Sequence, residues 1–340
     1  MVDRAILVIG PRWVGDMVMA QCLFTALKAV DPTRPIDVVA PAWAAPLLAR
    51  MPEVRTAIEA PFKPKEFGLL ARWRFGRRLA GRYATAYVLP GSWKSALVPL
   101  FAGIPERIGY RKEMRYGLLT EMQDLPAVIK RKTAETYFRL AATGGRRVNP
   151  RLAVDDANRA ALLAAHGLVA KHYVVMMPGA EFGPAKRWPS RHYAAFAAAR
   201  MAAGDRVVLL GSAKDGEVGA EIAALAPGVI DLTGQTKLVD AIDLVAGARL
   251  AVCNDSGLMH VAAAVGTPLV AVYGSTSADN TPPLSDRAEI VSLKLPCSPC
   301  HEKVCPKGHL DCLEKLAPDL VAAAADRMEA RATAAPGAPS

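Results

Sequence analysis

The stretch LAVCNDSGLMHVAAAVGTPLVAVYGS, residues 250–275, is typical of a strand, a tight loop, a short helix and a second strand. Leu250–Cys253 and Leu269–Tyr273 are continuous apolar runs, as expected for parallel strands that are buried on both faces. Between them, 254–257 supplies residues that favour a helix start, and Leu258–Val265 has a helical pattern. The stretch therefore predicts an open, parallel α/β sheet.

The loop at residues 254–257 is a candidate ligand site. In an open parallel sheet, ligands bind outside the carboxyl ends of the strands, where helix N-termini point. Such an N-terminus carries free N–H groups and about half a positive charge, which suits a phosphate. Gly257 has no side chain and lets a ligand approach closely. In the alternative interpretation, Asp255 or Ser256 only caps the helix.

Strands and helices alternate along the rest of the chain, which has 340 residues, 52% of them hydrophobic. This length and pattern predict an α/β protein of two domains. The segment GGRRVNP, residues 144–150, is the best candidate linker because it combines turn formers and charge without an apolar period. We expect domains at 1–148 and 149–330, and a disordered tail at 331–340. Lys65–Arg82 is expected to form a basic helix.

No apolar run reaches the roughly 18 residues of a membrane span. The N-terminus also lacks the small-residue cleavage site of a secretory signal. We therefore expect a cytoplasmic protein whose six cysteines are reduced.

Positive charge is concentrated in the first half. Residues 1–150 carry 24 Lys and Arg against 12 Asp and Glu, whereas residues 151–340 carry 18 against 20. Nucleic acid, an anionic membrane surface or a phosphorylated substrate would each fit such a half. A solvated basic surface with no partner is the simplest alternative.

Several common nucleotide and hydrolase motifs are absent. Neither half has Gly-x-Gly-x-x-Gly after its first strand or a Walker A pattern, and Gly-x-Ser-x-Gly does not occur. These absences argue against a dinucleotide oxidoreductase, a P-loop ATPase and an α/β-hydrolase.

Three charged or polar side chains are candidates for chemistry. Asp16 lies where the first strand passes into the first helix, so its carboxylate could accept a proton from a hydroxyl; it could also be a plain helix cap. Lys186, in the Gly/Pro loop 178–189, is well placed to meet a diphosphate, unless this loop is simply mobile and basic. His260 lies one turn into the helix after the 254–257 loop. It could contact the substrate directly, or it could be a hydrogen-bonded core residue. Trp188 is expected to pack.

Four cysteines near the C-terminus have the spacing Cys297-x2-Cys300-x4-Cys305-x6-Cys312. The spacing resembles that of a structural zinc ribbon without matching it. A structural zinc ion, an Fe–S cluster and four reduced thiols all remain open. We expect no catalytic metal and no cofactor.

Together these segments resemble glycosyltransferase family 9, the ADP-heptose:lipopolysaccharide heptosyltransferases, and most closely their heptosyltransferase II branch. The strings that carry the resemblance are GPRWVGDMVMAQ (10–21), PGAEFGPAKRWP (178–189), LLGSAKD (209–215), NDSGLMHVAAAVGTPLVAVYGST (254–276) and CSPCHEKVCPKGHLDCL (297–313). The resemblance implies a GT-B fold, with two Rossmann-like, doubly wound domains facing across a cleft.

The resemblance also implies a reaction and its residues. The reaction would be inverting transfer of heptose from ADP-heptose, held by the C-terminal domain, to the first heptose of heptosyl-Kdo2-lipid A, held by the N-terminal domain. Asp16 falls on the proposed catalytic base, and Lys186 falls on the lysine that meets the donor phosphates. The other donor-binding positions would be Gly15, Gly179, Asp255, Ser256, Gly257, Leu258 and His260. The heptosyltransferase I branch has hydroxyl residues at the positions of Glu181 and Phe182. We therefore assign these two residues no contact with the phosphates.

A lipid-linked acceptor also implies peripheral contact with the anionic inner face of the membrane, and no nucleic acid. The candidate membrane contacts are Arg72-Trp73-Arg74-Phe75 and Arg77-Arg78. Two other functions remain as alternatives. One is a nucleotide-sugar epimerase of the same architecture, and the other is a basic nucleic-acid-binding protein with a four-cysteine zinc module.

Overall fold

Strand β1 (Ile6–Ile9) lies inside a six-stranded sheet in the computed structural model, which describes residues 5–62 and 66–334. The strand order is β3-β2-β1-β4-β5-β6, and all the pairings are parallel. The other strands are β2 (Ile36–Ala40), β3 (Val54–Glu59), β4 (Thr85–Val88), β5 (Glu106–Tyr110) and β6 (Glu121–Gln123). β1 pairs with β2 on one side and β4 on the other, as in a doubly wound sheet.

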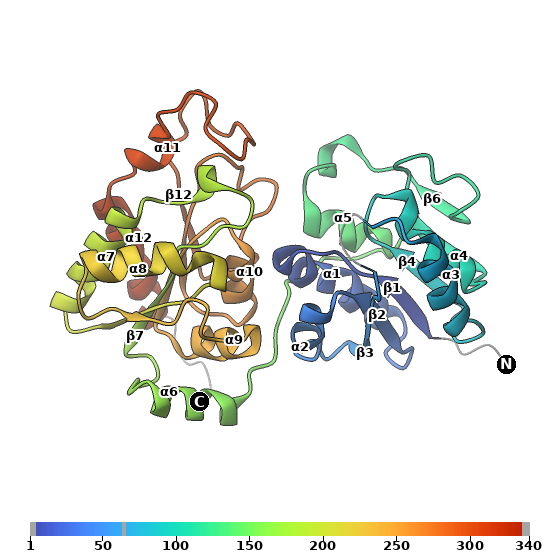
Figure 1. Ribbon diagram of the computed structural model, residues 1–340, viewed down its shortest axis with the longest axis horizontal. Coiled ribbons are helices and arrows are strands. Elements are labelled where there is room, and N and C mark those ends of the chain that lie inside the picture. The colour runs from blue at the N-terminus through green and yellow to red at the C-terminus, as the bar shows by residue number, and fades with distance from the viewer. Residues whose placement is uncertain (1–4, 63–65, 335–340) are drawn as a thin grey trace. The chain divides into compact units, whose positions relative to one another are not determined.

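Helices connect these strands, and four of them pack in two pairs. The helices are α1 (Val14–Val30), α2 (Ala45–Leu48), α3 (Leu69–Arg78), α4 (Leu97–Phe101) and α5 (Thr133–Leu140). Helix α1 packs against α5, and α3 packs against α4 (Figure 1).

A second parallel sheet has the order β12-β11-β10-β7-β8-β9. Its strands are β7 (Tyr173–Met177), β8 (Arg206–Leu209), β9 (Ile230–Asp231), β10 (Leu250–Asn254), β11 (Leu269–Val272) and β12 (Ala288–Val291). Its helices are α6 (Asp156–Ala165), α7 (Ser190–Ala202), α8 (Gly216–Leu225), α9 (Leu238–Gly247), α10 (Gly257–Ala264), α11 (Asp311–Glu314) and α12 (Pro318–Ala334). The predicted strand, helix and strand of residues 250–275 are thus β10, α10 and β11.

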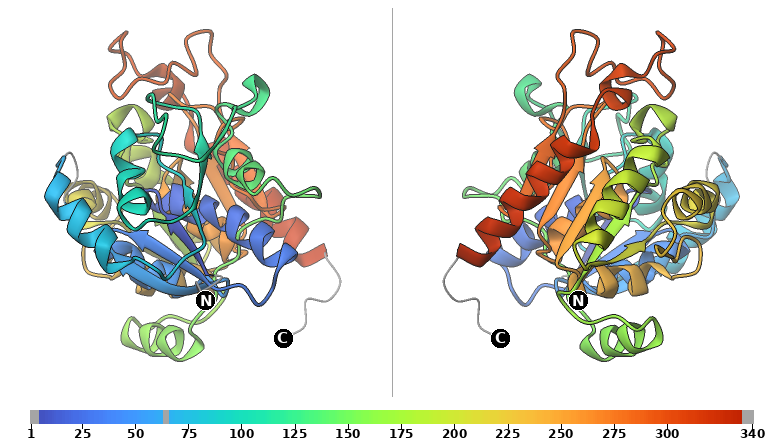
Figure 2. Two further views of the ribbon diagram at one scale, coloured as in Figure 1. Left: turned by 90° about the vertical axis from the view of Figure 1, so that its right-hand side faces the viewer. Right: turned by 90° about the vertical axis from the view of Figure 1, so that its left-hand side faces the viewer.

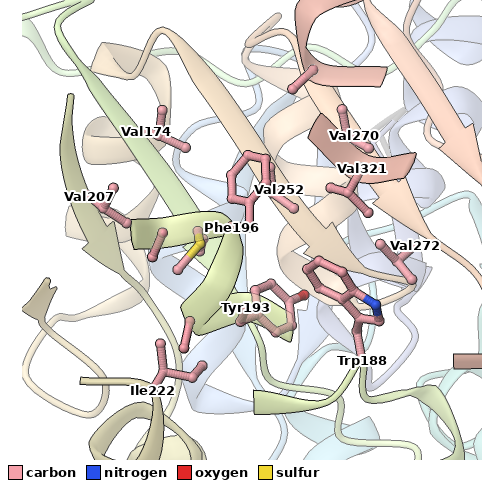
Figure 3. Packing of buried hydrophobic residues seen from close by; sticks show 14 of the residues in the cluster. Val174, Trp188, Tyr193, Phe196, Val207, Ile222, Val252, Val270, Val272 and Val321 are labelled. Atoms are coloured by element: carbon pink, nitrogen blue, oxygen red, sulfur yellow. The ribbon is translucent and has the colours of Figure 1, made fainter. Parts of the chain in front are cut away.

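Both faces of the second sheet are buried, which explains its unbroken apolar strands. Val174 and Val252 point into one cluster with Trp188, Tyr193 and Phe196 (Figure 3). The alternate residues of the same strands point into a second cluster on the other face, with α9 and α10. Side chains of a strand alternate between faces, so apolar residues are needed at every position.

The chain divides into two compact units, 1–150 and 151–340. The division follows directly on the predicted linker 144–150. Each unit holds one of the two sheets, as expected for two Rossmann-like, doubly wound domains.

Two predicted boundaries are wrong. The helix expected over Lys65–Arg82 spans only Leu69–Arg78, because Gly68 adopts a left-handed conformation, with φ of 52°, directly before it. Lys65 itself lies outside the described residues. The tail expected from residue 331 is helical as far as Ala334, because α12 continues there. The tail residues 335–340 lie outside the described part of the chain.

Helix α12 lies alongside α7 and against β11 and β12 (Figure 2, right). Leu316 and Leu313, just before it, are fully buried in the cluster that contains Trp188. Within the described residues, no helix has both the length and the hydropathy that a membrane span requires.

Candidate active site

Lys186 and Asp255 form a buried ion pair at the carboxyl end of β10. Lys186 Nζ lies 2.6 Å from Asp255 Oδ2, and the two side chains are 14% and 5% exposed. Thr276 Oγ1 donates a second hydrogen bond to the same oxygen, also at 2.6 Å. The structure thus joins two residues that are 69 positions apart and that were each predicted to bind the donor.

Asn254, the last residue of β10, fixes both ends of the loop that carries Lys186. Its Oδ1 accepts from the backbone N–H of Trp188 at 3.0 Å, and its Nδ2 donates to the carbonyl of Pro178 at 2.6 Å. Asn254 is completely buried. Its amide is therefore bound to loop 178–189 in two places, which restricts where Lys186 can reach.

Trp188 packs as predicted. It is 1% exposed, its ring lies 4.8 Å from that of Tyr193, and its Nε1 donates to the carbonyl of Leu316 at 2.8 Å. Phe182 lies under Lys186, whose Nζ is 5.0 Å from the ring centroid, a cation–π distance. Neighbouring Glu181 pairs with Lys214.

Helix α10 begins without a side-chain cap. Ser256 is the N-cap in backbone conformation, but its side chain makes no capping hydrogen bond. Asp255 is engaged by Lys186 and Thr276 instead. The alternative in which either residue merely caps the helix is therefore wrong. The half-buried Gly257 and Leu258 begin a helix whose first N–H groups no Ser256 side chain satisfies.

Residue 179 is a glycine because the side chain of Asp215 leaves no room for a Cβ atom there, and not because the backbone needs a positive φ. A Cβ at this position would lie 2.5 Å from the carboxyl carbon of Asp215, which is closer than real Cβ contacts. The Asp215 carboxylate in turn accepts hydrogen bonds from the backbone N–H and hydroxyl of Ser212. The structure therefore gives Gly179 a packing role in loop 178–189, and its predicted part in donor binding stays a prediction.

His260, the fourth residue of α10, is buried, with 5% of its surface exposed. Burial lowers the pKa of His260 to about 4; the charge of Asp255 raises this pKa and that of Lys186 lowers it further. The imidazole is therefore neutral at pH 7 and shares the electrostatic environment of the Lys186–Asp255 pair.

Asp16 lies in the first unit and lines a cavity of about 320 Å³. It is half-buried in the first turn of α1, whose N-cap is Trp13 with no side-chain cap bond. The alternative that makes Asp16 the N-cap of this helix is therefore wrong, because Asp16 is the third residue of α1. Buried Tyr137 lines the same cavity, and burial, with a further contribution from the charge of Asp16, raises the pKa of Tyr137 well above its usual value.

Four cations line this cavity with Asp16, namely Arg12, Lys112, Arg115 and Lys130. Arg115 is 1% exposed. Its guanidinium donates to the carbonyls of Pro90, at 2.9 Å, and Tyr110, while its Nε has no hydrogen-bond partner among the described residues. Burial lowers the pKa of Arg115, and the nearby Glu113 opposes this effect. A buried cation beside a cavity favours an anionic ligand there.

Gly15 is buried beside Asp16 in the first unit, whereas the other predicted donor-binding residues lie in the second. Asn254, Thr276 and Arg115 were not singled out from the sequence. Asn254 is the last residue of β10, and Thr276 lies in the loop that follows β11, four residues after its end. A polar residue at the carboxyl end of a buried parallel strand is the signal that could have found both. Arg115 had no comparable signal.

The four cysteines lie in the loop before α11 and in α11 itself, and all are free thiols. Among the described residues, no group of three or more His, Cys, Asp or Glu side chains is placed to hold a metal ion. The loop contacts loop 178–189 and the residues that follow β11. Lys303 O accepts from the N–H of Ala185 at 3.1 Å, and the N–H of His301 donates to Ser275 O at 2.7 Å.

The burial of His260 predicts a pH dependence of stability. Its pKa in the folded state lies below the usual 6.5, so the unfolded chain binds more protons between these values and stability falls as the pH drops from about 6.5 to 4. The loss should reach about 3 kcal/mol, and the variant His260→Gln should lack it. Urea unfolding from pH 7 to pH 4 measures the difference, with His172→Gln, at an exposed histidine, as the control. An equal loss of unfolding free energy in wild type and in His260→Gln would contradict this prediction.

Comparison with known proteins agrees with this geometry. The sequence profile of glycosyltransferase family 9 (heptosyltransferase) matches residues 72–311. Lipopolysaccharide heptosyltransferase 2 of Salmonella typhimurium is 46% identical over 305 residues, covering 85% of this chain and 88% of that one. The structure of ADP-heptose lps heptosyltransferase II from E. coli superposes with a TM-score of 0.86 at 42% identity, covering 97% of this chain and all of that one.

The similarity of this chain to a nucleotide-sugar epimerase is limited to the fold. UDP-GlcNAc 2-epimerase from Methanocaldococcus jannaschii is 9% identical, with a TM-score of 0.50, covering 85% of this chain and 88% of that one.

Proposed function

The chain belongs to glycosyltransferase family 9, the heptosyltransferases, and from this premise we propose how its residues carry out the reaction. The enzyme transfers heptose from ADP-heptose to the first heptose of the lipopolysaccharide inner core, with inversion at the anomeric carbon. The observation that carries this proposal is the Lys186–Asp255 pair, which lies at the start of the uncapped helix α10.

The second unit binds the donor in this proposal. Lys186 and the first N–H groups of α10 meet the diphosphate, and Asp255 then turns toward hydroxyl groups of the heptose. As the glycosidic bond breaks, the anomeric carbon passes through an oxocarbenium-like state, and ADP leaves with the bonding electron pair. Fixed positive groups stabilise the charge that develops on the diphosphate.

The first unit binds the acceptor. Asp16 accepts the proton of the acceptor hydroxyl as its oxygen attacks the anomeric carbon. The cations around Asp16 suit an acceptor that carries carboxylates on Kdo and phosphates on lipid A. Buried Arg115 and its neighbour Lys112 are the residues that we assign to these anions.

The lipid anchor of this acceptor places the reaction at the inner face of the membrane. The positive balance of residues 1–150 suits the anionic lipids of that surface. We therefore assign the protein a peripheral association with the membrane on the cytoplasmic side.

Replacement of Asp16 tests the base. Asp16→Asn keeps the size of the side chain but cannot accept a proton, so we expect kcat to fall by at least about 100-fold while ADP affinity is unchanged. Steady-state transfer assays and calorimetric titration with ADP measure the two effects. Asp124→Asn, an exposed carboxylate of the same unit, is the control. Turnover close to the wild-type value would leave Asp16 with a structural role only.

A panel of acceptors tests the reaction itself. Kdo2-lipid A carrying no heptose, one heptose or two heptoses is incubated with ADP-heptose, and both ADP release and the mass of the product are followed. We expect transfer to the acceptor with one heptose only, because the hydroxyl of that sugar is the nucleophile. Transfer to Kdo2-lipid A would instead assign the first heptose. Turnover of the donor without any acceptor would indicate an epimerase or a hydrolase.

A further inference from the structure

The solvent-facing side of helix α3 combines apolar and cationic side chains. Its exposed apolar residues are Leu69, Leu70 and Trp73, at 47%, 56% and 47% exposure, and its exposed cations are Arg74, Arg77 and Arg78. The helix contains no acidic residue. Three apolar side chains on the exposed side of a short surface helix are unusual unless that side meets a partner.

Two aromatic rings extend this surface beyond the helix. Phe67 and Trp93 are 44% and 42% exposed, and their ring centroids are 5.2 Å apart. Phe67 precedes α3, whereas Trp93 begins a short 3-10 helix, η2 (Trp93–Ser95). Chain segments that are 26 positions apart therefore present one exposed aromatic pair, and Phe67 precedes Leu69 by two residues in the chain.

The buried side chain of Arg72 links the segment before α3 to the segment of η2. It is 5% exposed, and its guanidinium donates to the carbonyls of Phe67, at 2.7 Å, and Lys94, at 3.4 Å. The sequence-based prediction that Arg72 and Phe75 contact the membrane is therefore wrong, because both side chains point into the protein. Arg72 instead orders the backbone that carries the exposed rings.

The helix itself is held closely against α4. A Cβ at Gly76 would lie 2.7 Å from Phe101 Cβ and 2.8 Å from the carbonyl oxygen of Val98. Only glycine permits this approach, so α3 is fixed in its rotation. The exposed apolar and cationic side chains are thus held outward by packing on the opposite side.

We propose that this surface, the α3 platform, binds an anionic lipid bilayer. The platform consists of Phe67, Leu69, Leu70, Trp73, Arg74, Arg77, Arg78 and Trp93. Aromatic and leucine side chains enter the boundary between headgroups and acyl chains, while arginines pair with lipid phosphates. A nucleic acid would use the arginines but would leave both leucines in water, so the mixed chemistry favours the bilayer. The proposal rests on the proposed function, which supplies a lipid-linked acceptor.

Vesicle binding by the full chain tests the platform. We expect wild type to sediment with vesicles of phosphatidylcholine and phosphatidylglycerol, and much less with phosphatidylcholine alone. The variant Arg74→Gln/Arg77→Gln should bind the mixed vesicles roughly 30-fold less, which corresponds to about 1 kcal/mol for each cation. Arg206→Gln/Lys307→Gln removes two exposed cations from the other unit and is the matched control.

A second pair of variants tests the apolar part. Trp73→Ser should weaken binding to the mixed vesicles several-fold and lower the salt-resistant fraction of binding, because the ring no longer enters the lipid. Trp43→Ser, at a tryptophan that is 37% exposed elsewhere in the same unit, should bind like wild type. Platform variants that sediment as wild type does, or controls that lose as much binding as they do, would overturn the proposal.

A transfer assay with a soluble acceptor distinguishes a failure of the platform proposal from a failure of the proposed function. Platform variants should transfer heptose to a heptosyl-Kdo oligosaccharide without acyl chains at the wild-type kcat/KM, because the platform contacts lipid only. If wild type transfers heptose neither to that acceptor nor to heptosyl-Kdo2-lipid A, the proposed function fails while the vesicle result still decides the platform. If the variants lose transfer to the soluble acceptor together with vesicle binding, the platform belongs to the acceptor site and the bilayer proposal is wrong.

Discussion

The ion pair between Lys186 and Asp255 is the interaction on which the proposed donor site depends. Both groups are largely removed from water, and such a pair repays its desolvation only when geometry and further hydrogen bonds are favourable. Thr276 and Asn254 supply these bonds by fixing the carboxylate and the loop. A diphosphate would give Lys186 a partner with more negative charge, so binding can exchange one buried pair for another.

Much of the fold follows from the sequence, because strands buried on both faces must be apolar at nearly every position. β7, β10 and β11 satisfy this condition, and their carboxyl ends carry the polar residues of the site. Short edge strands lack this signature. β6 and β12 have partly exposed residues, and neither was predicted. Helix ends depend on single residues, as Gly68 shows at the start of α3.

The sequence allowed the residues of the proposed site to be named one by one, but it did not give their arrangement. Lys186 and Asp255 could each be named from its loop, yet only the folded chain joins them. The cations around Asp16 come from separate loops, and Arg115 becomes informative only because it is buried. Arg72 differs from Arg115, because its charge led us to predict that it lies on the surface, whereas the structure shows it buried. Its orientation on α3 turns it inward, and charge counting cannot detect that orientation.

Calorimetric titration of wild type and Lys186→Met with ADP and with AMP tests the role of this lysine most directly. We predict that the substitution weakens ADP binding on the order of tenfold or more, since a charged hydrogen bond to the diphosphate is lost, and leaves AMP binding nearly unchanged. Lys315→Met, at an exposed and also salt-bridged lysine of the same unit, should leave both affinities unchanged. Equal ADP affinity in wild type and Lys186→Met would contradict the account of the donor site.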